Sequence, residues 1–166
     1  MTAPHTPPPD QPLSGNQKRK MRSAARLYAV QALFQMEHSD QGVDAVYGEF
    51  LQHRFGAELD DETDMIDGDV DLFRDILDGA VERQRPIDQM TDRALVAKWP
   101  INRIDPTIRA LFRAAGAELT GMDTPPKVVI MEYVDIAHSF FPEGREPKFV
   151  NAVLDHMARE TRPEAF

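Results

Sequence analysis

The sequence contains no cysteine, which excludes a disulfide scaffold, a thiolate metal site and a cysteine nucleophile. It also lacks an apolar run near the roughly 20 residues that a membrane-spanning helix needs. Residues 1–16 are polar and rich in proline, without the hydrophobic stretch of a signal peptide. We therefore expect a cytoplasmic protein with no membrane contact.

Motifs that carry catalysis are missing as well. The nine glycines are scattered and form neither a phosphate-binding loop nor a dinucleotide fingerprint. No serine has the surroundings of a nucleophile elbow, and the five histidines show no metal-ligand spacing. The acidic stretch from Asp60 to Asp71 imitates a calcium loop, but Met65 stands where that loop needs glycine. We expect no enzyme activity, no metal and no cofactor.

Charge is distributed unevenly in this chain, whose formal net charge is −9. Residues 37–82 carry fifteen acidic side chains and two basic ones. Residues 1–34 have a single acid and five cations, which are Lys18, Arg19, Lys20, Arg22 and Arg26. A partner responds to the field within about 10 Å, so this basic segment matters more than the sum over the chain.

The hydrophobic pattern is helical almost throughout from Gln17, and no segment alternates with the period of two that is typical of a strand. Asp105-Pro106 is a strong helix start, with a capping carboxylate followed by proline. We expect an all-α fold without a sheet and a disordered proline-rich tail at 1–17. About seven helices are expected, near residues 18–38, 43–55, 70–85, 87–98, 105–120, 125–141 and 146–159.

The basic start of the first expected helix is the sharpest functional signal. Arg19, Arg22 and Arg26 lie at offsets of three and seven, so we expect them to share one face of the helix. Lys18 and Lys20 flank this cationic strip. Clustered Lys and Arg side chains neutralise phosphates and release counterions, which favours RNA or DNA binding. The alternative is a solvated helix end.

A second candidate lies at the start of the last expected helix. Lys148 is placed beside the free N–H groups of a helix N-terminus, a suitable seat for a phosphate. Asn151 could read a base edge and Phe149 could stack on a base. Alternatively, Phe149 belongs to the core and Asn151 caps or bridges helices.

Four segments of this chain resemble the transcription antitermination factor NusB family, in the same order. They are Lys18 to Arg26 with Val30-Gln-Ala-Leu-Phe34-Gln35, then Asn102 to Arg113, Pro125 to Glu132, and Lys148-Phe-Val-Asn151-Ala-Val-Leu-Asp155. The similarity covers about residues 18–160. The resemblance implies two helical bundles packed across each other, at about 18–85 and 86–160, in a single RNA-binding domain spanning 18–166.

The same resemblance implies partners and a site. The family binds the boxA RNA of ribosomal RNA operon leaders together with the ribosomal protein NusE, and through them acts on the RNA polymerase complex. Its RNA surface would here be Lys18, Arg19, Lys20, Arg22 and Arg26, with Lys148, Phe149 and Asn151 in addition. The alternatives are a protein-only helical module or homodimer without an RNA role, and an enzyme, because a similar domain precedes certain RNA methyltransferases.

Overall fold

The computed structural model describes residues 14–55, 68–95 and 100–166, which form seven α-helices and two short 3-10 helices. No β-strand occurs in these three ranges, and the prediction of an all-α fold is confirmed. The α-helices are α1 (Gly15–Glu37), α2 (Val43–His53), α3 (Val70–Glu82), α4 (Gln84–Ala94), α5 (Pro106–Gly121), α6 (Pro126–Phe140) and α7 (Glu146–Thr161).

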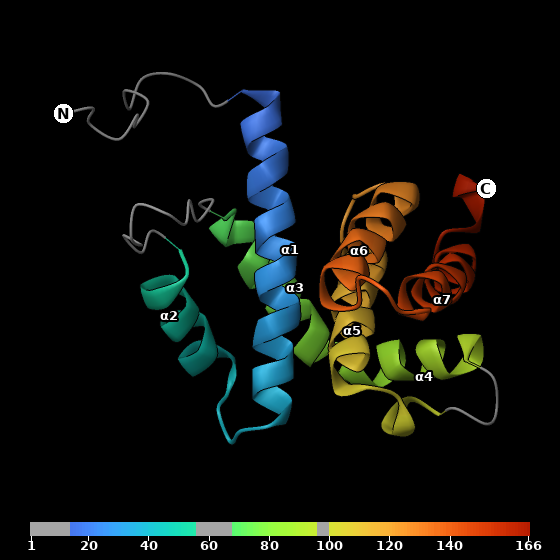
Figure 1. Ribbon diagram of the computed structural model, residues 1–166, viewed down its shortest axis with the longest axis horizontal. Helices are drawn as coiled ribbons and strands as arrows, with labels where there is room; N and C mark the ends of the chain where they lie inside the picture. Colours follow the sequence, from blue (N-terminus) through green and yellow to red (C-terminus); the bar gives the residue numbers. More distant parts are fainter. Residues whose placement is uncertain (1–13, 56–67, 96–99) are drawn as a thin grey trace.

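The helices form two groups that meet along α5 (Figure 1). Helices α1, α2 and α3 pack together on one side, and α4, α6 and α7 pack with α5 on the other. Helix α5 also contacts α1 and α3, so one hydrophobic core runs through both groups. The largest fully buried side chains come from both bundles: Phe73, Ile76, Leu77, Ile87, Phe112 and Tyr133.

Side-chain caps fix the beginnings of α1, α3 and α5, and the cap of α3 is Asp69, which accepts from the Leu72 N–H at 3.0 Å. The Ser14 hydroxyl accepts a hydrogen bond from the Gln17 backbone N–H at 3.1 Å, and the Gln17 side chain accepts one from the Ser14 N–H at 2.8 Å. This capping box starts α1 at Gly15, three residues before the expected position. Asp105 caps α5 through the Thr107 N–H at 2.8 Å, as its sequence predicts.

Other boundaries differ from expectation. Pro86 does not end the third helix, because α3 ends at Glu82 and Pro86 lies in the first turn of α4, where a missing N–H is tolerated. Helix α4 packs on α5 and α7, which places it in the second bundle. The expected tail lies almost wholly outside the described residues, and so does most of the acidic stretch weighed as a calcium loop. The fourth helix was expected to run to Lys98, but α4 ends at Ala94 and the next residue, Leu95, is extended.

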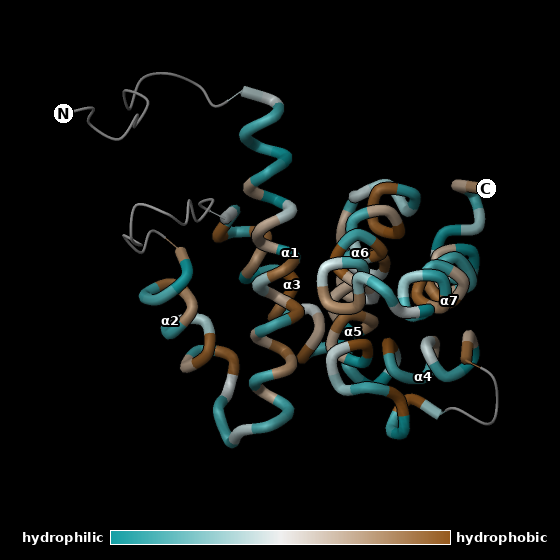
Figure 2. Tube along the Cα trace, in the orientation of Figure 1, coloured by the Kyte–Doolittle hydropathy of each residue, from teal (hydrophilic) through white to brown (hydrophobic). Residues whose placement is uncertain are grey.

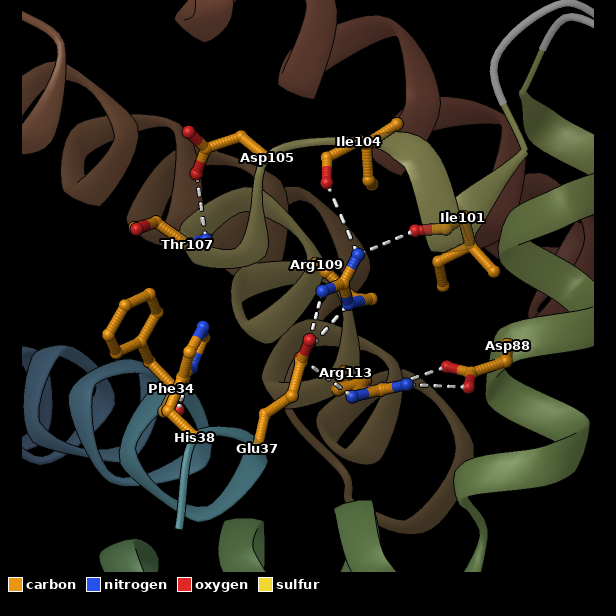
Figure 3. A network of polar contacts seen from close by, with 10 residues as sticks. All are labelled: Phe34, Glu37, His38, Asp88, Ile101, Ile104, Asp105, Thr107, Arg109 and Arg113. Atoms are coloured by element: carbon orange, nitrogen blue, oxygen red, sulfur yellow. Dashed lines mark hydrogen bonds and ion pairs between the residues drawn. The ribbon is translucent and has the colours of Figure 1, made fainter.

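A network of charged side chains joins the two bundles at the far end of α1 (Figure 3). Glu37 of α1 accepts hydrogen bonds from Arg109 Nε at 2.9 Å and from Arg113 Nη1 at 3.2 Å, both on α5. Arg113 also makes a bidentate pair with Asp88 of α4, at 3.0 Å for each bond. The network ties α1, α4 and α5 together, and so holds the orientation of α1 relative to the second bundle.

Candidate nucleic-acid interface

The first turns of α1, which carry Lys18, Arg19 and Lys20, extend past the neighbouring helices (Figure 1). The tube coloured by hydropathy shows the same turns as hydrophilic (Figure 2). Lys18, Arg19 and Lys20 are exposed, and Arg22 is half-buried. Since the capping box holds these turns in the helix, the charges are displayed from a fixed backbone rather than from a flexible tail.

An open groove of 820 Å³ lies between the N-terminal half of α1 and the side of α6 that faces it. Arg19 and Lys20 line it from α1, and Arg54 lines it from the end of α2. Glu132 and Asp135 line it from α6. The remaining lining residues, apolar and uncharged polar, are Asn16, Ser23, Ala24, Leu27, Tyr28, Gln31, Ile136 and Ser139.

Lys18 and Arg22 lie on a different side of α1. They line a smaller hollow of 430 Å³ with Asp69 and Asp71 at the start of α3. The Asp69 N–H donates to the Met21 carbonyl at 2.9 Å, which fixes this contact between the two helices. The nearby carboxylates weaken the attraction of Lys18 and Arg22 for phosphate. These cations of α1 therefore divide between two sites: Arg19 and Lys20 line a groove with charges of both signs, and Lys18 and Arg22 line a hollow beside two acidic residues.

Arg26 departs most clearly from expectation. Its side chain is buried, with 3% exposed, and its guanidinium donates to Glu118 of α5 at 2.8 Å from Nε and 3.0 Å from Nη2. Burial lowers the pKa of Arg26, but the hydrogen bond and charge of Glu118 outweigh it and raise the pKa overall. Arg26 was expected to belong to the cationic strip with Arg19 and Arg22, but it is buried and positions α1 against α5.

The buried network reaches the groove through Glu132. The Ser23 hydroxyl donates to the Glu132 carboxylate, at 2.9 Å to Oε2 and 3.2 Å to Oε1. Arg26 Nη1 lies 3.5 Å from Glu132 Oε1, and Tyr133 donates to Glu118 at 2.7 Å. These contacts fix the separation of α1 and α6, and therefore the width of the groove.

The second candidate cluster lies apart from this groove. Lys148 and Asn151 are exposed in the first turns of α7, while Phe149 is half-buried and packs edge-on against Phe112, with ring centroids 6.1 Å apart. None of the three lines the α1–α6 groove. Helix α6 contacts both α1 and α7 and lies between them in Figure 1. The structure therefore does not merge the two clusters into one patch.

Sequence reasoning missed two kinds of groove residue. Arg54 follows the acidic face of α2, and nothing local indicates that it faces the start of α1. Glu132 and Asp135 were unremarkable among 28 acids, although their spacing of three does put both on one face of a helix. Only the packing of α1 against α6 gives these residues a shared surface.

Neither a metal centre nor a membrane span is found in the described ranges. No group of three or more His, Asp or Glu side chains there is arranged to hold a metal ion. None of the helices described is both long enough and apolar enough to cross a bilayer.

The structure is that of a small all-α binding protein. It has two helical bundles, and a projecting cationic helix lies beside an open groove. The NusB family model matches residues 23–159, and the chain belongs to this family. The transcription antitermination protein NusB of Maricaulis maris is 46% identical over 150 residues, which cover 90% of this chain and 92% of that protein. The one of Sinorhizobium fredii is 47% identical over 158 residues, covering 95% and 96%. The resemblance noted in the sequence is confirmed.

Solved structures show the same fold. NusB of T. maritima superimposes with a TM-score of 0.70 at 30% identity, covering 87% of this chain and 96% of that one. A chain from the crystal structure of antitermination factors NusB and NusE in complex with double-stranded RNA gives a TM-score of 0.69. It is 22% identical and covers 85% of this chain and 98% of its own length, a likeness that establishes the fold. The two-bundle arrangement is thereby confirmed.

Proposed function

We propose that this chain is a transcription antitermination factor that binds the boxA RNA of ribosomal RNA operon leaders together with the ribosomal protein NusE. The proposal rests on sequence identity. Two relatives named transcription antitermination protein NusB are 46% and 47% identical to this chain over nearly its full length. A protein of the same fold has been crystallised with NusE and double-stranded RNA. The site of action is the cytoplasm, where transcription takes place, and contact with RNA polymerase is indirect.

The proposed RNA surface begins with the exposed cations of α1. Lys18, Arg19 and Lys20, together with half-buried Arg22, provide charge for phosphates, whereas Arg26 supports the helix from inside. Lys148, Phe149 and Asn151 at the start of α7 form a second, separate contact. We treat residues 18–166 as one RNA-binding unit because α5 packs against helices of both bundles.

A binding assay tests the proposal directly. The purified chain is titrated into a labelled ribosomal leader RNA containing boxA, with and without NusE, and into the same RNA with a scrambled boxA. We expect tighter binding to boxA RNA, a further gain with NusE, and affinity that falls as salt rises. Equal binding to both RNAs at every salt concentration would contradict the proposal.

The same assay separates the competing functions. A protein-only module or homodimer would bind NusE or itself but show no salt-dependent RNA binding. An RNA-modifying enzyme would transfer a group to the RNA; we propose that this chain does not, since a cysteine nucleophile of the kind that cytosine methyltransferases use is absent from it. Mass spectrometry of the recovered RNA checks that point.

A further inference from the structure

The α1–α6 groove has walls of opposite charge. One wall carries the exposed cations Arg19 and Lys20, with Arg54 at the edge. The other wall carries two carboxylates of α6, Glu132 and Asp135. A groove built only to grip phosphates would exclude these carboxylates, because like charges inside a narrow cleft repel a polyanion. Glu132 already fixes the contact between α1 and α6, but Asp135 has no such role, so its place in the groove needs another explanation.

We propose that this groove seats unpaired bases of single-stranded RNA and selects bases that carry an exocyclic amino group. The phosphates run along α1 and Arg54, and the base edges face α6, where Asp135 and Glu132 accept hydrogen bonds from the amino group of cytosine, adenine or guanine. This inference rests on the proposed function and adds which bases the site prefers.

The acceptors in the groove are positioned for such donors. Glu132 is oriented by Ser23 at 2.9 Å and by Arg26 at 3.5 Å, with 17% of its side chain exposed. Asp135 is exposed, and among the described residues its carboxylate makes neither a hydrogen bond nor an ion pair. An ionised carboxylate only accepts hydrogen bonds, so it favours an amino group and repels the O4 carbonyl of uracil.

A third acceptor in the groove strengthens the case. Gln31 Oε1 is buried and has no hydrogen-bond partner among the residues that the structure describes. Buried polar atoms are nearly always paired, and leaving one unpaired is unfavourable. Because this atom is buried, a base in the groove bonds it only if the Gln31 side chain turns toward the groove. The carboxylates of Glu132 and Asp135 are acceptors alone, whereas the Gln31 amide has a donor group as well as its acceptor oxygen.

The floor of the groove suits a flat aromatic ligand. It includes half-buried Leu27 and the buried side chains of Ile136 and Tyr28, and the Tyr28 ring packs edge-on against Phe55 with centroids 5.0 Å apart. The open volume of 820 Å³ lies within the usual range of 300–1,000 Å³ for ligand clefts. Apolar surface below and acceptors at one side are what an extruded base requires in single-stranded RNA recognition.

The test compares Asp135→Asn with a matched control, Asp123→Asn. Both residues are exposed and both changes remove one negative charge, but Asp123 lies outside the groove, between α5 and α6. The affinity of each protein for labelled single-stranded oligo(C) and oligo(U) of equal length is measured by fluorescence anisotropy at one salt concentration. Thermal unfolding followed by circular dichroism verifies that each variant is folded.

We expect the unchanged protein to prefer oligo(C), and Asp135→Asn to reduce the ratio of the two affinities about tenfold, because an amide can also donate to uracil. Asp123→Asn should keep the original ratio. If Asp135→Asn raises both affinities equally, the carboxylate only repels phosphate and the inference is overturned. An unchanged ratio with boxA RNA still bound in a salt-dependent manner refutes the inference but leaves the proposed function intact. Absence of all RNA binding refutes both.

Discussion

Arg26 of α1 and Glu118 of α5 form a buried bidentate ion pair, with 3% and 0% of their side chains exposed. The Glu118 carboxylate also accepts hydrogen bonds from Tyr133 at 2.7 Å and from Thr124 at 3.1 Å. The pair thus gathers α1, α5 and α6 around a single buried carboxylate. Its geometry fixes the projecting cationic helix to the second bundle.

Removing one partner of this pair should destabilise the fold strongly. Arg26→Met leaves Glu118 charged and buried, and Glu118→Met does the same to Arg26, so each should cost about 3–5 kcal/mol of unfolding free energy. The double variant should recover much of that loss because no unpaired charge remains. Urea denaturation measures all four proteins. Single variants within about 1 kcal/mol of the parent would argue against a desolvated pair, since exposed pairs contribute no more than that.

The position of Arg26 illustrates what helical spacing can and cannot predict. Residues seven apart differ by only about 20° around a helix, so Arg19 and Arg26 do point in similar directions. Spacing says nothing of where along the axis the neighbouring helices begin. Because α1 extends past α5 and α6, the same face is exposed at Arg19 and buried at Arg26 (Figure 1). A buried partner such as Glu118 leaves no local signal.

The prediction of helices succeeded where local chemistry decides the outcome. Asp105 caps α5 as predicted, because a carboxylate before proline satisfies an N–H within its own turn. Pro86 misled the prediction because proline is tolerated both after a helix and within a first turn. The choice between these positions is made by tertiary packing, as Ile87 is buried against Gly116 of α5.

Tyr133 should make the fold sensitive to alkaline pH. Burial, followed by the neighbouring Glu118 carboxylate, raises its pKa well above the usual value of 10.0. The stability that depends on the neutral phenol is complete below pH 10 and is lost above it, since the unfolded chain ionises first. Tyr133→Phe should therefore lose less unfolding free energy than the parent on going above pH 10. Parallel pH dependences for the two proteins would contradict this account.

Glu37 should make the stability of the fold sensitive to acidic pH. Arg109 donates to it and holds its pKa below the usual value of 4.5. The stability from the carboxylate is present above that value and is lost as the pH falls further. We expect Glu37→Gln to lower the unfolding free energy at neutral pH and to flatten its decline in acid. Glu164→Gln, which alters an exposed carboxylate near the C-terminus, is the matched control and should follow the parent.

The division of the α1 cations predicts unequal contributions to RNA binding. Arg19 and Lys20 line the open groove, whereas Lys18 and Arg22 lie beside Asp69 and Asp71. Each phosphate contact with a single strand contributes about 0.7 to the slope of log affinity against log salt. Replacing Arg19 and Lys20 together by alanine should flatten this slope by about 1.4, if each contacts one phosphate.

Replacing Lys18 and Arg22 by alanine removes the same charge from the same helix and is the matched comparison. Its effect should be smaller, because the two carboxylates of α3 already offset those cations before RNA arrives. Filter binding of boxA RNA over a salt series gives both slopes. Equal flattening would mean that phosphates contact both sides of α1. A larger effect of the Lys18 and Arg22 replacements would mean that the RNA binds on the α3 side of α1 and not on the α6 side. Arg26 is unsuitable for this comparison, since its loss perturbs the buried pair with Glu118 and would weaken binding through the fold.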